Sequence, residues 1–132
     1  MKLDPEARYA ETHEWARKDG DVIVCGITDH AQEQLSDIVY VELPEVGDAF
    51  EKGEVFATVE SVKAAADVYM PIGGEITEVN EELEDAPQLV NEDAFGAAWF
   101  ARFTASDLSE LDDLMDAEAY VKFVAEEEAE GG

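Results

Sequence analysis

Two short runs of β-branched and aromatic residues flank Lys63, in the stretch from Val55 to Val79. Residues of these types fit a pleated, half-buried surface. The segment Glu60–Ala64 joins the two runs and contains the lysine. We therefore predict two strands whose connection holds the amine of Lys63 out toward solvent. This arrangement suits a protein that presents one amine to a modifying enzyme.

An exposed lysine is ordinary, because lysine side chains are mostly solvated in folded proteins. Plain surface charge is therefore the simplest interpretation of Lys63. Two features favour a special role. The chain has only five lysines, and Lys63 lies among the small apolar residues Val62 and Ala64–Ala66. Small neighbours leave room for the active site of another protein to close over the amine.

The rest of the chain repeats short β-type runs separated by turn signals. Residues 12–17 and 22–27 predict a hairpin, because Asp19–Gly20 between them is a strong turn signal. Thr28 can cap a short helix that we expect to end near residue 37. Further strands are expected at 38–43, 75–79 and 97–103. This pattern of many short strands predicts a mainly β sandwich or barrel.

The pattern changes toward the C-terminus. Residues 80–95 form a long acidic connection, and such loops are commonly functional or mobile. Ser106 and Asp116 can each cap a helix, so we expect C-terminal helices at about 106–126 with apolar stripes. The acidic residues that follow are expected to form a frayed end.

The charge of the chain excludes several kinds of partner. Its 132 residues include 34 acidic and 8 basic ones, for a formal net charge of −26. Such a field repels nucleic acid and anionic membranes, so neither is an expected partner. Because the acidic residues are spread through the whole sequence, a salt-adapted, halophile-like protein is favoured over one that recruits basic partners. No signal peptide, transit peptide or membrane span is recognisable, so we expect a cytoplasmic protein.

No motif predicts a catalytic centre or a metal site. The sequence has no Gly-rich phosphate loop, no CxxC and no HExxH. The only histidines, His13 and His30, are unlinked in sequence, and we interpret them as surface or core residues rather than metal ligands. Cys25 is expected to be a small buried hydrophobe. We therefore expect a non-catalytic protein whose chemistry is supplied by another molecule.

Several segments, in order along the chain, resemble a single family. They are 26–32 (GITDHAQ), 41–44 (VELP), 60–64 (ESVKA), 74–75, 79–80, 89–91 and the strand around Trp99. From about Tyr9 to Tyr120 the sequence resembles the H protein of the glycine cleavage system. The resemblance implies a barrel-sandwich hybrid of the lipoyl/biotinyl type, with a short internal helix and C-terminal helices. It also implies a single lipoyl-carrier domain over residues 1–132, with its core at about 9–104.

The resemblance assigns roles to individual residues. It implies that Lys63 carries lipoate in amide linkage. The attachment motif around the lysine consists of Glu60, Ser61, Val62 and Ala64. The residues implied to dock the loaded arm are Thr12, Glu14 and Asp67. A carboxylate in such a pocket would favour a cationic aminomethyl nitrogen, although ordinary surface charge is the alternative interpretation of both carboxylates. The sequence departs from many relatives at Gln34, Ala66 and Gly73, which concern details of arm docking.

The resemblance further implies a shuttle between enzymes. The lipoyl group would receive an aminomethyl group from a pyridoxal-phosphate glycine decarboxylase and deliver it to a tetrahydrofolate-dependent aminomethyltransferase. Dihydrolipoyl dehydrogenase would then reoxidise the dithiol, and a lipoate ligase or lipoyl transferase would attach the cofactor. Tethering keeps the intermediate at a high effective concentration. A monomer is expected.

Four other roles are alternatives for a chain of this pattern. A biotin carrier usually has methionines beside the lysine, where this chain has Val62 and Ala64. A lipoyl domain of a 2-oxoacid dehydrogenase is shorter and usually has Asp before the lysine. An H-like relay protein that supplies lipoyl groups to other 2-oxoacid dehydrogenase complexes could have much the same sequence. An unmodified β-domain that acts only in protein interactions is the fourth alternative.

Overall fold

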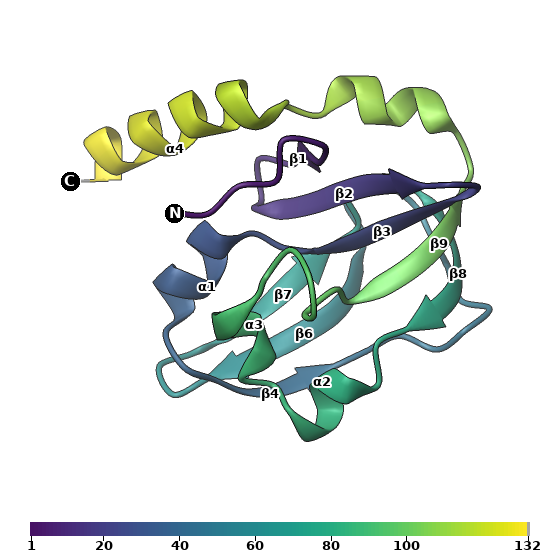
Figure 1. The fold of residues 1–132 in the computed structure, drawn as a ribbon, viewed down its shortest axis with the longest axis horizontal. Helices are drawn as coiled ribbons and strands as arrows, with labels where there is room; N and C mark the ends of the chain where they lie inside the picture. The colour runs from purple at the N-terminus through teal and green to yellow at the C-terminus, as the bar shows by residue number, and fades with distance from the viewer. Residues whose placement is uncertain (132) are drawn as a thin grey trace.

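Two antiparallel sheets face each other in the computed structural model, which describes residues 1–131 (Figure 1). In spatial order, the larger sheet contains β1 (Arg8–Tyr9), β2 (Glu14–Asp19), β3 (Val22–Ile27), β9 (Ala101–Ala105), β8 (Gly74–Val79) and β5 (Ala49–Phe50). The smaller sheet contains β4 (Ile38–Glu42), β6 (Val55–Ser61) and β7 (Ala65–Tyr69). The chain crosses repeatedly between the sheets. The predicted mainly β class is confirmed.

Both predicted hairpins are present. The β2–β3 pairing runs from Glu14 opposite Ile27 to Asp19 opposite Val22. Gly20 occupies the turn with φ of 61°, a conformation that glycine adopts without steric cost. In the second hairpin Glu60 pairs with Ala65, so residues 62–64 form the turn between β6 and β7.

The larger sheet is buried on both faces around β2 and β3. Ala16 and Cys25 belong to the core that the two sheets enclose, and Cys25 is fully buried as expected. Trp15 and Val24, which alternate with them, belong to a second apolar cluster on the opposite face. This alternation follows from the period of two along a strand.

The helix α4 (Ala117–Gly131) supplies the cover for that second cluster. Its Tyr120 is fully buried and stacks on Tyr9, with ring centroids 4.6 Å apart. Figure 1 shows α4 lying over β1 and close to the N-terminus. The backbone N–H of Ala119 donates to the Asp116 carboxylate at 2.8 Å, as expected of a cap. The helix continues past residue 126, where a frayed end was expected.

The short helices differ from expectation in two places. Thr28 caps α1 (Asp29–Leu35) as predicted, since its hydroxyl accepts from Ala31 N at 3.2 Å. The connection after β8 contains α2 (Glu82–Asp85) and α3 (Leu89–Glu92) instead of an open loop. A helix capped by Ser106 was expected next. The structure instead has the 3₁₀ helix η1 (Leu108–Asp113), and its cap is Asp107.

The last strand starts later than predicted, at Ala101 instead of residue 97. The side-chain amide of Asn80 donates to the carbonyls of Ala97 and Trp99, at 2.8 and 2.9 Å. These bonds hold the preceding segment in a turn. Within residues 1–131, no helix combines the length and the apolar character needed to cross a membrane.

Candidate functional site

The connection between β6 and β7 forms a tight turn around the hydroxyl of Ser61. This hydroxyl accepts from the backbone N–H groups of Lys63 and Ala64, at 3.2 and 3.1 Å, and donates to the carbonyl of Ala64 at 3.1 Å. The N–H of Ser61 also donates to Ala64 O at 2.8 Å. Such side-chain-to-backbone bonds are typical of serine in turns. Ser61 therefore fixes the backbone that carries the lysine.

A second connection ties the turn to the body of the protein. The N–H of Val62 donates to Asp37 O at 3.0 Å, in the segment between α1 and β4. Asn91 of α3 holds that segment, because its amide donates to Ser36 O at 2.8 Å and its oxygen accepts from Ile38 N at 2.9 Å. The sequence alone gave no role to Asn91 beyond its place in a resembling segment.

Lys63 is exposed, and Val62 beside it is 66% exposed. The Lys63 Nζ atom donates to the backbone carbonyl of Gln34, at 3.4 Å. Among the described residues, no carboxylate forms an ion pair with this amine. The ammonium group is therefore accessible and weakly held, and it points toward the C-terminal end of α1.

A small cavity of ≈180 Å³ opens beside that end of α1. The structure brings all three predicted arm-docking residues, Thr12, Glu14 and Asp67, to its wall. Gln34, whose carbonyl accepts from Lys63, lines the same cavity. His13 also lines the cavity, and the rest of the wall is apolar, formed by Ile27, Ala31, Leu35, Val59, Ala66 and Val68. Of these apolar residues only Ala66 was connected with arm docking from the sequence, because the others have the pattern of ordinary core residues.

Glu14 is the buried polar group of this cavity, with 2% of its surface exposed. Its carboxylate accepts from the Thr12 hydroxyl and, at 3.3 Å, from Tyr69 N. Burial raises the pKa of Glu14 to about 7, and the two hydrogen bonds counteract the increase only in part. Thr12 and Asp67 are exposed at the rim. The site thus offers one buried carboxyl group below an apolar wall.

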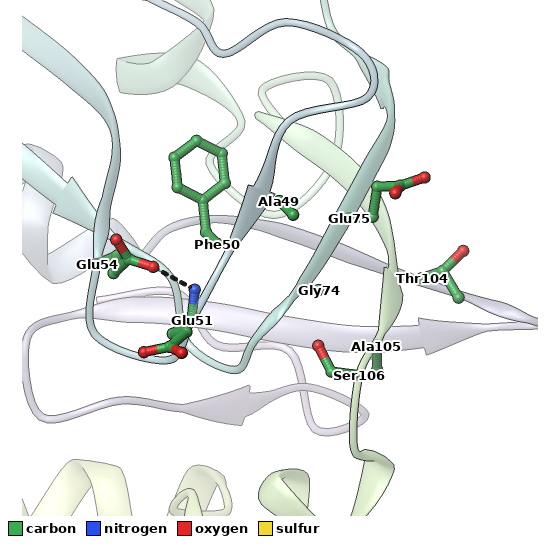
Figure 2. A pocket seen from close by; sticks show the side chains of 9 residues that line it. All are labelled: Ala49, Phe50, Glu51, Glu54, Gly74, Glu75, Thr104, Ala105 and Ser106. Atoms are coloured by element: carbon green, nitrogen blue, oxygen red, sulfur yellow. Dashed lines mark hydrogen bonds between the residues drawn. The ribbon is translucent and has the colours of Figure 1, made fainter.

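A larger cavity of ≈720 Å³ lies along β5, β8 and β9 and contains none of the predicted site residues (Figure 2). Its polar groups include Glu51, Glu54 and Glu75, and the Glu54 carboxylate accepts from Glu51 N at 2.6 Å. We assign the site to the smaller cavity of ≈180 Å³, because the smaller cavity adjoins the accessible amine of Lys63 and has an apolar wall.

An exposed primary amine beside an apolar cavity suits a covalently attached acyl group with a nonpolar chain. For such a group the amine would provide the attachment point, and the cavity would shelter the free end. A carboxylate at the base of the cavity would stabilise a cation on that end. The described residues at this site therefore combine an accessible amine with an adjoining apolar cavity, an arrangement that suits a carrier.

Known proteins resemble the chain over nearly its whole length. The family model described as "Glycine cleavage H-protein" matches residues 7–127. The glycine cleavage system H protein of Pseudoalteromonas translucida is 58% identical over 126 residues, covering 95% of this chain and 98% of that protein. Its counterpart from Thermus thermophilus is 53% identical over 127 residues, covering 96% and 99%. The crystal structure of a glycine cleavage system H protein from Mycobacterium marinum has a TM-score of 0.83 at 33% identity, over 91% of this chain and 97% of that one.

Proposed function

The chain belongs to the glycine cleavage H-protein family, whose members are carrier components rather than catalysts, and from this premise we propose that Lys63 carries lipoate. The loaded arm would take an aminomethyl group from glycine decarboxylase to the aminomethyltransferase. It would then present the dithiol to dihydrolipoyl dehydrogenase. When attached, lipoate supplies a disulfide–dithiol couple, which the single cysteine of this chain cannot form within one molecule.

The observation that carries the proposal is the position of the Lys63 amine. It lies 3.4 Å from the carbonyl of Gln34, a residue that lines the ≈180 Å³ cavity. The amine is accessible for acylation, and the apolar wall suits the hydrocarbon part of a lipoyl group. The site residues therefore fit the cofactor, with Glu60, Ser61, Val62 and Ala64 as the recognition motif.

Each site residue has a proposed physical task. Ser61 holds the turn rigid through its hydroxyl, and Val62 and Ala64 leave the amine unobstructed. Thr12 orients the carboxylate of Glu14 by a hydrogen bond. Glu14 and Asp67 favour a cationic group on the end of the arm, since both are carboxylates at one cavity. Exclusion of water by the apolar wall strengthens that attraction.

The proposal extends to partners and location. A lipoate ligase or lipoyl transferase attaches the cofactor, and the three enzymes of glycine cleavage use it in turn. The carrier acts as a monomer in the cytoplasm. The unpaired Cys25, buried in the core, is compatible with a reducing compartment.

Intact-mass measurement of the protein from its native cells, with peptide mapping, tests the attachment. We expect one lipoyl-sized addition on Lys63. Lys63→Arg should abolish the addition and the glycine-dependent reduction of NAD⁺ in a mixture with the three enzymes. Lys52→Arg is the matched control, because it changes another exposed lysine and should leave both readouts intact.

The other possible results identify the alternative roles. A biotin-sized addition would move the protein to the carboxylase carriers. A lipoylated protein that fails in glycine cleavage but donates its lipoyl group to 2-oxoacid dehydrogenases would be a relay protein. A bare Lys63 under lipoate-replete growth would contradict the carrier function.

A further inference from the structure

The fold brings the only two histidines of the chain together beside the arm cavity, which His13 lines, and the carrier function assigns no role to either ring. His13 precedes β2 and His30 lies in α1, and their ring centroids are 4.9 Å apart. The side chains of Glu127 and Glu128 reach this pair from α4. The Nε2 atom of His13 lies 3.1 Å from Glu127 Oε1, and His30 Nδ1 lies 3.9 Å from Glu128 Oε1.

His13 is oriented for this cluster by its other ring nitrogen. Its Nδ1 atom lies 2.7 Å from the hydroxyl of Tyr120, which also lies 2.8 Å from the Thr28 hydroxyl. Tyr120 is fully buried, so the position of its hydroxyl is fixed by packing. A partner of this kind on the second nitrogen is what metal-binding histidines ordinarily have, because it sets the tautomer and the direction of the ring.

His30 has a polar ring without a hydrogen-bond partner in the described part of the chain. Its side chain is only 7% exposed, and the Glu128 oxygen at 3.9 Å is too distant for a hydrogen bond. Its ring nitrogens are not sealed from solvent, since Arg102 Nε is the only fully buried side-chain polar atom without a partner among the described residues, so a nitrogen of His30 is free to bind a ligand. A cation between the two rings would bind to that nitrogen.

The separations suit one small divalent cation. One ligand atom each from His13, His30 and Glu127 can be chosen so that all lie within 4.8 Å of one another. Zinc bonds to nitrogen and oxygen are about 2.0–2.2 Å, so ligand atoms around one zinc ion lie at most about 4 Å apart. Glu127 is exposed, and its Oε1 atom already lies 3.1 Å from His13 Nε2, within that limit.

We propose that His13, His30 and Glu127 form a binding site for a first-row divalent cation such as Zn²⁺, with Glu128 as a further oxygen ligand. Imidazole and carboxylate ligands in this combination suit zinc, cobalt and nickel rather than magnesium or calcium. The ion would join α4 to α1 and to the segment that carries Thr12 and Glu14. The site would therefore fasten the C-terminal helix beside the arm cavity.

The test uses the full chain, labelled with ¹⁵N, stripped with a chelator and kept in molar KCl. Molar salt limits unspecific attraction of cations by the acidic surface. Zn²⁺ is added alone, and the ring resonances of the two histidines are followed by NMR. We expect both rings to respond, with saturation at one equivalent of Zn²⁺. Mg²⁺ at the same concentration should leave both rings unchanged.

Two variants that remove one carboxylate each separate the site from general acidity. Glu127→Gln should raise the dissociation constant for Zn²⁺, measured by calorimetry, by about tenfold or more. Glu126→Gln lies one position earlier on the exposed surface of α4, makes the same charge change, and should leave the constant unchanged. Both variants alter exposed side chains and should keep the wild-type urea midpoint.

Three results would overturn the proposal. One is a Zn²⁺ titration in which one or neither histidine ring responds. The second is an equal loss of affinity in the Glu126 and Glu127 variants, which would mean unspecific binding to surface charge. The third is an equal response to Mg²⁺, because magnesium has little preference for imidazole ligands.

Discussion

Replacing Glu14 by Gln should change how the stability of the protein depends on pH. Glu14 is 2% exposed, and burial raises its pKa from 4.5 to about 7. The folded state therefore holds this proton at pH values where the unfolded chain has released it. Its contribution is most favourable below pH 4.5 and declines as the pH rises to about 7, after which it stays constant.

The size of the effect follows from the same two pKa values. One pH unit corresponds to about 1.4 kcal/mol, so the interval from 4.5 to about 7 gives a loss of about 3 kcal/mol. The Gln variant lacks this titration. The free energy of unfolding of the variant minus that of the wild type should therefore rise by about 3 kcal/mol between pH 4.5 and pH 8. Altered hydrogen bonds to Thr12 and Tyr69 add an offset that does not depend on pH.

Urea unfolding across this pH range measures the difference directly. The buffers should contain molar KCl, to screen the other carboxylates, and a chelator, to remove divalent cations from nearby His13. Asp67→Asn is the matched control, because it removes an exposed carboxylate of the same cavity. A Glu14→Gln curve that stays parallel to the wild type from pH 4.5 to 8 would refute the claim that burial of this carboxyl is costly.

Three further predictions concern the rest of the molecule. The thermal midpoint should rise from low to molar KCl, because salt screens a net charge of −26; a midpoint that does not rise would contradict salt adaptation. Tyr120→Phe should lower the free energy of unfolding in urea by about 1–3 kcal/mol, because the buried hydroxyl contacts His13 and Thr28; an unchanged midpoint would show that neither contact stabilises the fold. Gly74→Ala should cost about 3 kcal/mol in the same assay, since the added methyl group would overlap the carbonyl oxygen of Thr104; wild-type stability would mean that β8 and β9 can separate freely.

Local sequence patterns were enough to place the turn that carries Lys63. The β-formers on both sides of it and the small residues within it predicted a hairpin, and β6 and β7 pair as expected. The turn at Asp19–Gly20 and the helix cap at Thr28 were also predicted correctly, because each depends on residues only a few positions apart. Turns and caps that involve residues close in sequence are determined by local backbone geometry.

Long-range contacts explain what sequence patterns did not predict. The strand expected from residue 97 begins at Ala101, because the Asn80 side chain holds the preceding backbone in a turn. Leu83 and Val90 are buried in helical turns within a segment that looked like an acidic loop. His13 meets Glu127 across 114 positions of sequence, and no spacing rule connects residues so distant.

The hydrogen bonds that close the turn at Ser61 have a consequence for how a carrier searches for its partners. The backbone at Lys63 is anchored within the turn and to Asp37, so the point at which the proposed arm would be attached is fixed. If Lys63 carries the proposed lipoyl group, the volume that the arm sweeps would be set by the flexible side chain and that group alone. A loose pivot would enlarge that volume and dilute the reactive end within it. A rigid attachment point would instead require each proposed partner enzyme to approach from one side, so that the orientation of the whole carrier would become part of recognition.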